Sequence, residues 1–236
     1  VEVDGVDDVT QVVAGGLHTC ARREDGAMFC WGRNDRGQLG DGTFEQRTRA
    51  VEVTGLTDVV DMCAGDGHSC AVDAGGRVWC WGENAAGQLG QPIDSPTEST
   101  VPLVVESGLP PAVGVACSIG VEGADSTCAT LADGLVWCWG SNAFGQLATE
   151  TSTPTPSPQV PEGVTSLAMG TTQTCAIVDG AIRCWGIAEA PEELPAGGFT
   201  SLTLGGLHGC GLQQDGGLWC FGDDADGQLG DGPDAI

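Results

Sequence analysis

The chain has 236 residues, of which 33 are acidic and only eight are basic, all of them arginine, so its formal net charge is −25. Because a polyanion repels other polyanions and no apolar run is long enough to span a bilayer, we expect neither a nucleic-acid partner nor membrane insertion. Its 12 cysteines contain no Cys-x-x-Cys pair and are too many for a reducing cytosol, which predicts a secreted or cell-surface protein.

One pattern recurs along the chain: His-x-Cys, a short turn segment, Cys-Trp-Gly, and then Gly-Gln-Leu-Gly. The third copy has Ser126 in place of the histidine and ends its last turn in Ala148, and the fourth has Gln173 and lacks that turn. The fifth copy has Phe221 in place of tryptophan. Copies of a pattern that recur every few tens of residues indicate a solenoid, a propeller or another array.

Each copy predicts short strands joined by turns. In the first copy, the apolar stretch 12–15 leads into Cys20, a turn follows at 24–26, and 27–31 returns as the next strand. The segment 50–56 is typical of an outer strand, and no stretch shows the apolar period of a helix. We therefore predict an all-β propeller of five four-stranded blades in a single domain, 1–236. The predicted repeats are 7–56, 57–108, 109–162, 163–198 and 199–236.

The two cysteines of each copy flank a hairpin, where paired strands bring residues opposite one another within bridging distance. On a chain-entropy model, each such bridge contributes roughly 3 kcal/mol. The predicted disulfides are Cys20–Cys30, Cys70–Cys80, Cys128–Cys138, Cys175–Cys184 and Cys210–Cys220. Cys63 and Cys117 lie outside the hairpins, in similar places in the second and third copies. They form either a sixth bridge between neighbouring blades or two buried thiols.

The end of the ring is predicted from a match between two segments. Val1–Val6 resembles 51–56, the outer strand that follows the first Gly-Gln-Leu-Gly turn. The fifth copy ends soon after its own turn, before such a strand. We therefore expect Val1–Val6 to pair into the last blade and close the ring, leaving no open sheet edge. The alternative is a fragment, cut at repeat boundaries, of a larger ring, which would show the same ends.

Together, the motifs A-G-x-x-H-x-C, C-W-G, N-x-x-G-Q-L-G and V-x-V-x-G resemble the regulator of chromosome condensation repeat. They are most similar to its cysteine-paired, secreted bacterial version. The resemblance implies a β-propeller, most often seven-bladed, whose known uses are nucleotide exchange on a small GTPase, chromatin binding and inhibition of β-lactamase. The negative charge disfavours the chromatin role and the cysteines disfavour the cytosolic exchange role. A rigid disc whose loops hold a protein is the use that remains.

Several residues invite a chemical hypothesis. His18, His68 and His208 occupy one repeat position and would form a metal or catalytic centre if they met, but a repeated structural hydrogen bond explains them better. Asp223–Gly227 resembles a calcium loop, with Asp224 and Asp226 as ligands, yet it lacks the full ligand spacing. We expect no metal and no cofactor. No catalytic set is expected either, because nearly every cysteine has a hairpin partner.

The tryptophans fall into two sets. Trp31, Trp81, Trp139 and Trp185 share one repeat position beside a disulfide, which favours core packing over carbohydrate stacking. Trp79, Trp137 and Trp219 lie two residues earlier. Two insertions, 91–110 and the Thr/Ser/Pro-rich 149–161, are expected to be exposed, the second as an extended loop suited to O-glycosylation.

The sequence thus predicts an extracellular binding scaffold, not an enzyme, with a protein as its partner. Two alternatives stay open. One is a structural repeat unit of a cell-surface assembly, which an arginine-rich start and an acidic end would suit by self-association. The other is a glycan-binding lectin.

Overall fold

The computed structural model describes residues 2–91, 96–105, 108–120, 125–147, 153–160, 163–187 and 194–232, with the backbone alone for 153–160. These residues form antiparallel strands in five separate sheets, which we call the first to fifth blades. No helix occurs in the described part of the chain, so none there is long and apolar enough to cross a membrane.

Three blades have four strands and two have three. The first blade consists of β1 (Val9–Ala14), β2 (His18–Arg23), β3 (Met28–Gly32) and β4 (Arg47–Glu52). The second consists of β5 (Val59–Ala64), β6 (His68–Asp73), β7 (Val78–Glu83) and β8 (Glu98–Val104). The third consists of β9 (Ala112–Cys117), β10 (Ser126–Leu131), β11 (Val136–Gly140) and β12 (Thr153–Val160). The fourth has β13 (Val164–Met169), β14 (Gln173–Val178) and β15 (Ala181–Gly186), and the fifth has β16 (Phe199–Leu204), β17 (His208–Gln213) and β18 (Leu218–Gly222).

The central hairpin of each blade has the same construction. Its turn contains a glycine with positive φ, such as Gly26 at 80°, because a tight reversal needs a conformation that side chains disfavour. The two strands that flank this turn place Cys20 directly opposite Cys30, and the same register recurs in every blade. All five hairpin disulfides are present in the structure, and a sixth joins Cys63 to Cys117.

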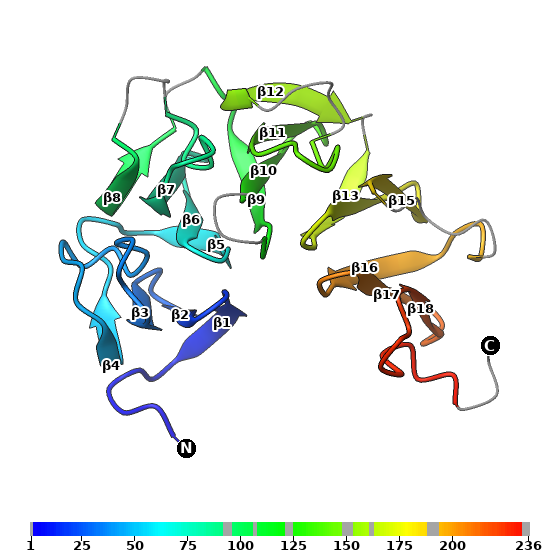
Figure 1. Ribbon diagram of the computed structural model, residues 1–236, viewed down its shortest axis with the longest axis horizontal. Coiled ribbons are helices and arrows are strands. Elements are labelled where there is room, and N and C mark those ends of the chain that lie inside the picture. The colour runs from blue at the N-terminus through cyan, green and yellow to red at the C-terminus, as the bar shows by residue number, and fades with distance from the viewer. Residues whose placement is uncertain are drawn as a thin grey trace.

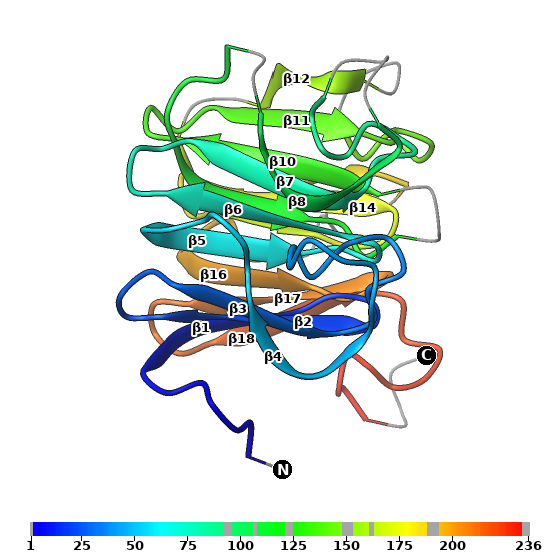
Figure 2. The ribbon, with the colours of Figure 1, turned by 90° about the vertical axis from the view of Figure 1, so that its left-hand side faces the viewer.

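The blades lie side by side in an open arc (Figure 1). The first strand of each blade lies nearest the centre, and each of these strands contacts its counterpart in the next blade. The strands run across the thickness of the disc, and the segment before β1 extends away from the sheets (Figure 2). The core is divided into clusters that lie between neighbouring blades, so each blade is covered by the next.

The arc corrects the predicted closure. Residues 2–6 belong to no sheet, and the described part of the last blade has three strands, so no pairing of Val1–Val6 with β18 is found among the described residues. The physical reason is curvature: the five blades span only part of a circle, and the first and last blades lie on opposite sides of the gap (Figure 1). The prediction of four strands in every blade is also wrong for the described parts of the fourth and fifth blades.

Both predicted insertions contribute outer strands. Residues 153–160 form β12, which pairs with β11, although the segment reads as an exposed loop because of its prolines. An outer strand tolerates proline because one side of its backbone needs no ladder partner. Within the other insertion, 98–104 forms β8, which pairs with β7, and Val105 after it is buried. The remainder of both insertions lies partly outside the described residues.

Candidate functional site

Neighbouring blades are joined by a repeated contact to the Gly-Gln-Leu-Gly turn. The backbone carbonyl of Gln38 accepts hydrogen bonds from the Trp81 indole and the Ser69 hydroxyl of the second blade, each 2.9 Å long. The turn also needs close approach, since a Cβ at Gly40 would lie 2.7 Å from the Trp81 nitrogen. The same pair of donors reaches the carbonyls of Gln88 and Gln146 from the next blade along. Trp81, Trp139 and Trp185 therefore hold neighbouring blades together.

His18 and His68 lie in these junctions. His18 Nε2 is 2.8 Å from the Ser69 hydroxyl, and His68 Nε2 is 3.0 Å from the Thr127 hydroxyl. Both rings are buried, with 3% and 0% of their surface exposed. His208 begins β17 in the last blade, and among the described residues no group of three or more metal-ligating side chains contains a histidine.

His68 has a second, unexpected partner, Asp125. The carboxylate is completely buried, lies 3.1 Å from His68 Nδ1, and also accepts hydrogen bonds from the amides of Gly67 and Gly120. Burial by itself would raise the pKa of Asp125, but the hydrogen bond and charge of His68 and the two amides outweigh it and lower that pKa. No other copy of the repeat has an aspartate at this position, so the sequence pattern offered no signal for it.

Asp125, His68 and Thr127 are linked in the order carboxylate, imidazole and hydroxyl, as in a catalytic triad, but their surroundings indicate a structural role. The Thr127 hydroxyl donates to the Gln88 carbonyl at 2.9 Å, and all three side chains are fully buried. A nucleophile must reach a substrate, and none can enter here without separating the second and third blades. The arrangement is a buried clamp between blades.

His18 is held neutral by its surroundings. Burial, with a smaller contribution from the nearby His68, lowers the pKa of His18 to about 4, and Asp125 partly opposes both effects. Because the Ser69 hydroxyl donates to the Gln38 carbonyl, it accepts from His18 Nε2, which must carry the proton. His18 Nδ1 is buried and has no hydrogen-bond partner.

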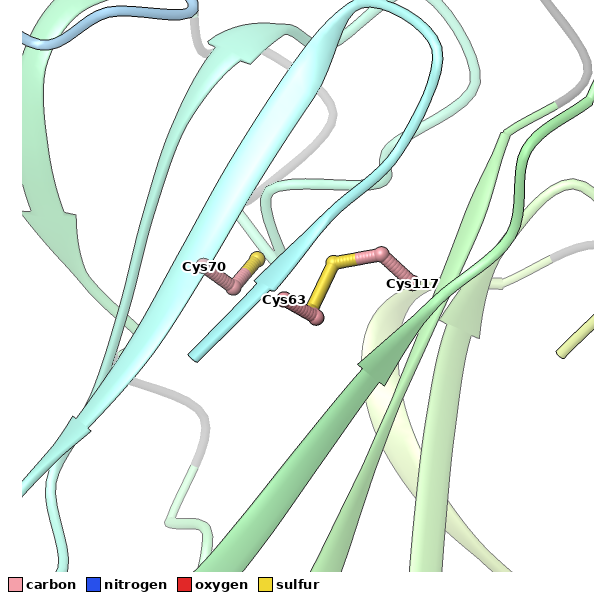
Figure 3. A group of neighbouring side chains, drawn as sticks. All are labelled: Cys63, Cys70 and Cys117. Carbon is pink, nitrogen blue, oxygen red and sulfur yellow. A yellow bond between two sulfur atoms is a disulfide. The ribbon is translucent and has the colours of Figure 1, made fainter. Parts of the chain in front are cut away.

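The junction between the second and third blades, which contains His68 and Asp125, also holds the sixth disulfide. Cys63 of β5 and Cys117 of β9 are joined across the two blades, and Cys70 of β6 lies beside them (Figure 3). All three are buried. The repeat pattern marked Cys63 and Cys117 as exceptions to the hairpin pairing and left a bridge or two buried thiols as alternatives; the structure has the bridge.

The predicted calcium loop is a turn of the same kind as the others. The Asp224 carboxylate accepts from the Leu229 amide at 2.8 Å, as Asn34 does from Leu39 in the first blade. Asp226 contributes its backbone amide to the Gln228 side chain. The hydrogen bonds of Asp224 thus explain its place in the repeat without an ion.

The junction between the fourth and fifth blades differs, and it differs on both sides. The fourth blade has no Gly-Gln-Leu-Gly turn, and the fifth has Gly209 and Phe221 where the others have a hydroxyl and an indole donor. The acceptor and both donors are absent together. Buried Phe221 instead packs with Ile177, Ile182 and Phe199.

The two ends of the arc expose surfaces that other blades bury. Leu218 is 67% exposed, whereas its counterparts Met28 and Val78 are 1% and 2% exposed. At the other end Val12 is 63% exposed, against 2% for its counterpart Met62. Each end of the arc therefore exposes a face that the other blades bury against a neighbouring blade.

A pocket of about 420 Å³ opens on the first blade, beside the turn that follows β3. Its apolar members Leu17 and Phe44 are 64% and 51% exposed. Arg33 forms an ion pair with Asp35 at 2.6 Å, and that hydrogen bond lowers the pKa of Asp35. Asn34 fixes the wall by donating to the backbone carbonyls of Thr43 and Glu45. Gly32 and Gln46 complete the lining.

Antiparallel sheets that carry hairpin disulfides and lie side by side, with their first strands nearest the centre, define a repeat protein of the β-propeller class. The sequence pattern of the regulator of chromosome condensation (RCC1) repeat matches residues 25–72, 75–121 and 133–177. A second version of that repeat matches residues 9–38, 59–88 and 113–146. Because these matches cover more than half of the chain, it belongs to the RCC1 repeat family. No curated protein sequence matches it.

Solved structures share this fold. Human WBSCR16 has a TM-score of 0.79 and 24% identity, over 94% of this chain and 63% of its own. Prp20p of Saccharomyces cerevisiae has a TM-score of 0.74 and 23% identity, over 91% and 57%. The ectodomain of the Arabidopsis thaliana receptor kinase ACR4 has a TM-score of 0.56 and 22% identity, over 91% and 65%. This chain thus spans less than two thirds of each of these structures.

Proposed function

We propose that this chain is an extracellular scaffold that holds a protein partner at the pocket on the first blade. The observation that carries the proposal is the pairing of two exposed apolar side chains, Leu17 and Phe44, with an arginine in one preformed pocket. Aromatic and arginine side chains dominate the energetics of protein interfaces, and a rigid pocket loses little entropy on binding. The six disulfides keep the blades that carry it rigid.

Structures of similar fold support a binding role. The yeast protein Prp20p is described by its binding to Gsp1p and histones, and another structure has Kap60 bound to yeast RCC1. Our proposal for this chain takes over only the general use, protein binding by a propeller. A net charge of −25 makes histones and other basic proteins compatible by charge but does not direct them to this pocket.

The compartment is part of the proposal. Twelve cysteines, all paired in six disulfides, suit an oxidising environment such as the cell surface. A receptor-kinase ectodomain among the structures of similar fold is consistent with such a location. We therefore retain the cysteine-paired, secreted bacterial version of the repeat as the interpretation, with binding and not catalysis as its activity. The closed Asp125–His68–Thr127 clamp supports the non-enzymatic reading.

The pocket is tested by replacing Leu17 and Phe44 together with serine. We expect the double variant to lose partners that wild-type protein captures from surface material of its source, because truncating buried anchors of an interface costs about 2 kcal/mol or more each. Ile187→Ser is the matched control, since Ile187 is 65% exposed on the fourth blade. Equal capture by the double variant and the wild type would refute the pocket as the binding site.

A second candidate, a structural unit that docks with further blades of the same kind, is favoured by the ends of the arc. The first blade keeps Thr19 and Trp31, whose counterparts in other blades donate to a glutamine carbonyl, although neither side chain makes a hydrogen bond in the described part of the chain. The last blade keeps Gln228, which could supply such a carbonyl. By contrast, the fifth blade lacks the hydroxyl and indole donors, and the fourth blade before it lacks the Gly-Gln-Leu-Gly turn that would supply their acceptor.

Light scattering over a range of concentrations tests this candidate. If the end of the first blade docks, apparent mass should rise with concentration, and the double variant Thr19→Gly/Trp31→Phe, which copies the fifth blade, should reduce that rise. Ile187→Ser serves again as the control. A mass that stays that of one chain at every concentration would exclude association between copies.

A further inference from the structure

A second pocket, of about 200 Å³, opens on the inner strands of the second, third and fourth blades. Most of its wall comes from β5, β9 and β13, which lie nearest the centre of the arc (Figure 1). Its polar members are Asp61 of β5, Thr130 of β10, and Thr165 and Ser166 of β13. The pocket shares no residue with the one on the first blade, so it is a separate candidate site.

The third blade departs from the repeat where this pocket lies. Gly114 occupies a position at which the inner strands of the other blades carry a polar side chain: Gln11, Asp61, Ser166 and Ser201. Opposite Gly114 stands Thr130, where the other blades have Arg22, Val72, Ile177 and Leu212. A Cβ on Gly114 would lie 3.3 Å from Asp61 Oδ2, so the missing side chain opens the space beside that carboxylate.

The Asp61 carboxylate is held in place by the inner strands on both sides of β5. Its Oδ1 accepts a hydrogen bond from Gln11 Nε2 at 2.7 Å, and its Oδ2 accepts one from the Val115 amide at 2.9 Å. Each carboxylate oxygen can accept about two hydrogen bonds, so both retain room for a further donor. The Thr165 hydroxyl donates to the Ile177 carbonyl at 3.4 Å, and its oxygen can still accept. The pocket therefore presents fixed acceptors.

Fixed acceptors beside an apolar wall suit a small cation with several N–H donors. An alkylammonium has three such donors, no acceptor and a compact charge, and its methylenes can lie against Val113 and Leu167. Calcium takes six to eight oxygen ligands, whereas Asp61 is the one carboxylate in this lining. No aromatic side chain lines the pocket, which disfavours a stacked sugar.

The charge of the chain also favours a cationic ligand. Its net charge is −25, and after Arg77 it has a single arginine, Arg183. The guanidinium of Arg22 donates to Gln11 Oε1 at 3.3 Å, so the Gln11 amide stands between that arginine and Asp61. The chain contains no lysine, so a lysine ammonium that enters the pocket belongs to another molecule.

We propose that this pocket binds the ammonium group of a lysine side chain of a protein partner. The ammonium donates to the Asp61 carboxylate and to the hydroxyls of Thr165 and Ser166, and the lysine methylenes lie along Val113 and Leu167. This site goes beyond the proposed function, because it recognises a different group at a different place. Either site can fail its test without affecting the other.

The test titrates n-butylammonium chloride, at constant ionic strength, into the whole chain with ¹³C-labelled valine and leucine methyl groups. We expect saturable shifts of the Val113 and Leu167 methyl signals. Asp61→Asn should weaken binding about tenfold or more, because a charged hydrogen bond is lost. Gly114→Ser should block binding, since it places beside the intact carboxylate the residue of the fourth and fifth blades. The control Asp215→Asn removes one exposed charge from the fifth blade and should change the affinity by less than about twofold.

Gly114→Ser keeps the test decisive if Asp61→Asn loosens the contact between blades. Equal binding by the wild type and Gly114→Ser would overturn the site. So would equal shifts caused by tetramethylammonium, which has no N–H donor.

Peptides identify the source of the ammonium. A capped pentapeptide with a central lysine should shift the same methyl signals, and its acetyl-lysine version should not. Binding of 1,4-diaminobutane more than about tenfold tighter than the lysine peptide would assign the pocket to a free diamine and overturn the protein partner.

Discussion

Replacing Trp81 by alanine should lower the free energy of unfolding by about 3–5 kcal/mol, the range for removing a large buried aromatic side chain. Trp81 is completely buried in the core cluster between the first and second blades, among Leu39, Val53 and Met62. Alanine would leave a cavity there and also leave the Gln38 carbonyl without its indole donor. Equilibrium unfolding in guanidinium with the disulfides intact measures the difference.

Two further variants separate packing from hydrogen bonding. Trp81→Phe keeps most of the packing and reproduces the residue of the fifth blade, so it should cost only about 1 kcal/mol for the lost hydrogen bond. Trp219→Ala is the matched control, because Trp219 is 43% exposed at the end of the arc and should cost less than about 1 kcal/mol. A loss at Trp219 as large as that at Trp81 would contradict the assignment of Trp81 to the contact between blades.

The features that the sequence predicted well are those that repeat. Cys20 faces Cys30 because a hairpin with its turn at Gly26 fixes the strand register, and the same spacing in other copies fixes theirs. The histidines were correctly expected to make structural hydrogen bonds at His18 and His68, because their position recurs without a complete ligand set. Because each copy of a repeat shows the same local pattern, a prediction made from one copy can be checked against the others.

The features that escaped prediction depend on relations between distant parts of the chain. Asp125 reaches His68 across 57 positions, and its own repeat position carries an aspartate in no other copy, so no pattern marks it. The open arc follows from the angle between blades, which packing sets and no short motif encodes. The strand 153–160 was missed for another reason, since its prolines mimic a loop but are compatible with an outer strand.

Acid should weaken the fold through His18. Its pKa is about 4 in the folded protein against an ordinary value of 6.5, so between these values the unfolded chain binds a proton that the folded chain does not. Stability is therefore fully present above pH 6.5 and falls as the pH drops toward 4. A difference of this size corresponds to about 3 kcal/mol over the whole window.

The geometry gives the physical reason for this penalty. His18 Nε2–H already donates to Ser69, and His18 Nδ1 lies buried against Gly15 without a partner. Protonation would place a charge and an unsatisfied N–H in that site. Asp125, whose pKa is lowered from 3.8, adds a further loss of stability only as the pH falls below that value, so measurements above about pH 4.5 isolate the histidine contribution.

The variant His18→Gln tests the assignment, because glutamine occupies the same position in the fourth blade, as Gln173. Unfolding free energies are measured by guanidinium titration at intervals from pH 7.5 to 4.5 for the wild type and the variant. We expect the wild type to lose most of the 3 kcal/mol over this range and the variant to show a much flatter profile, since it has no titrating group there. If both proteins lose stability equally, His18 is not the acid-sensitive group of this junction.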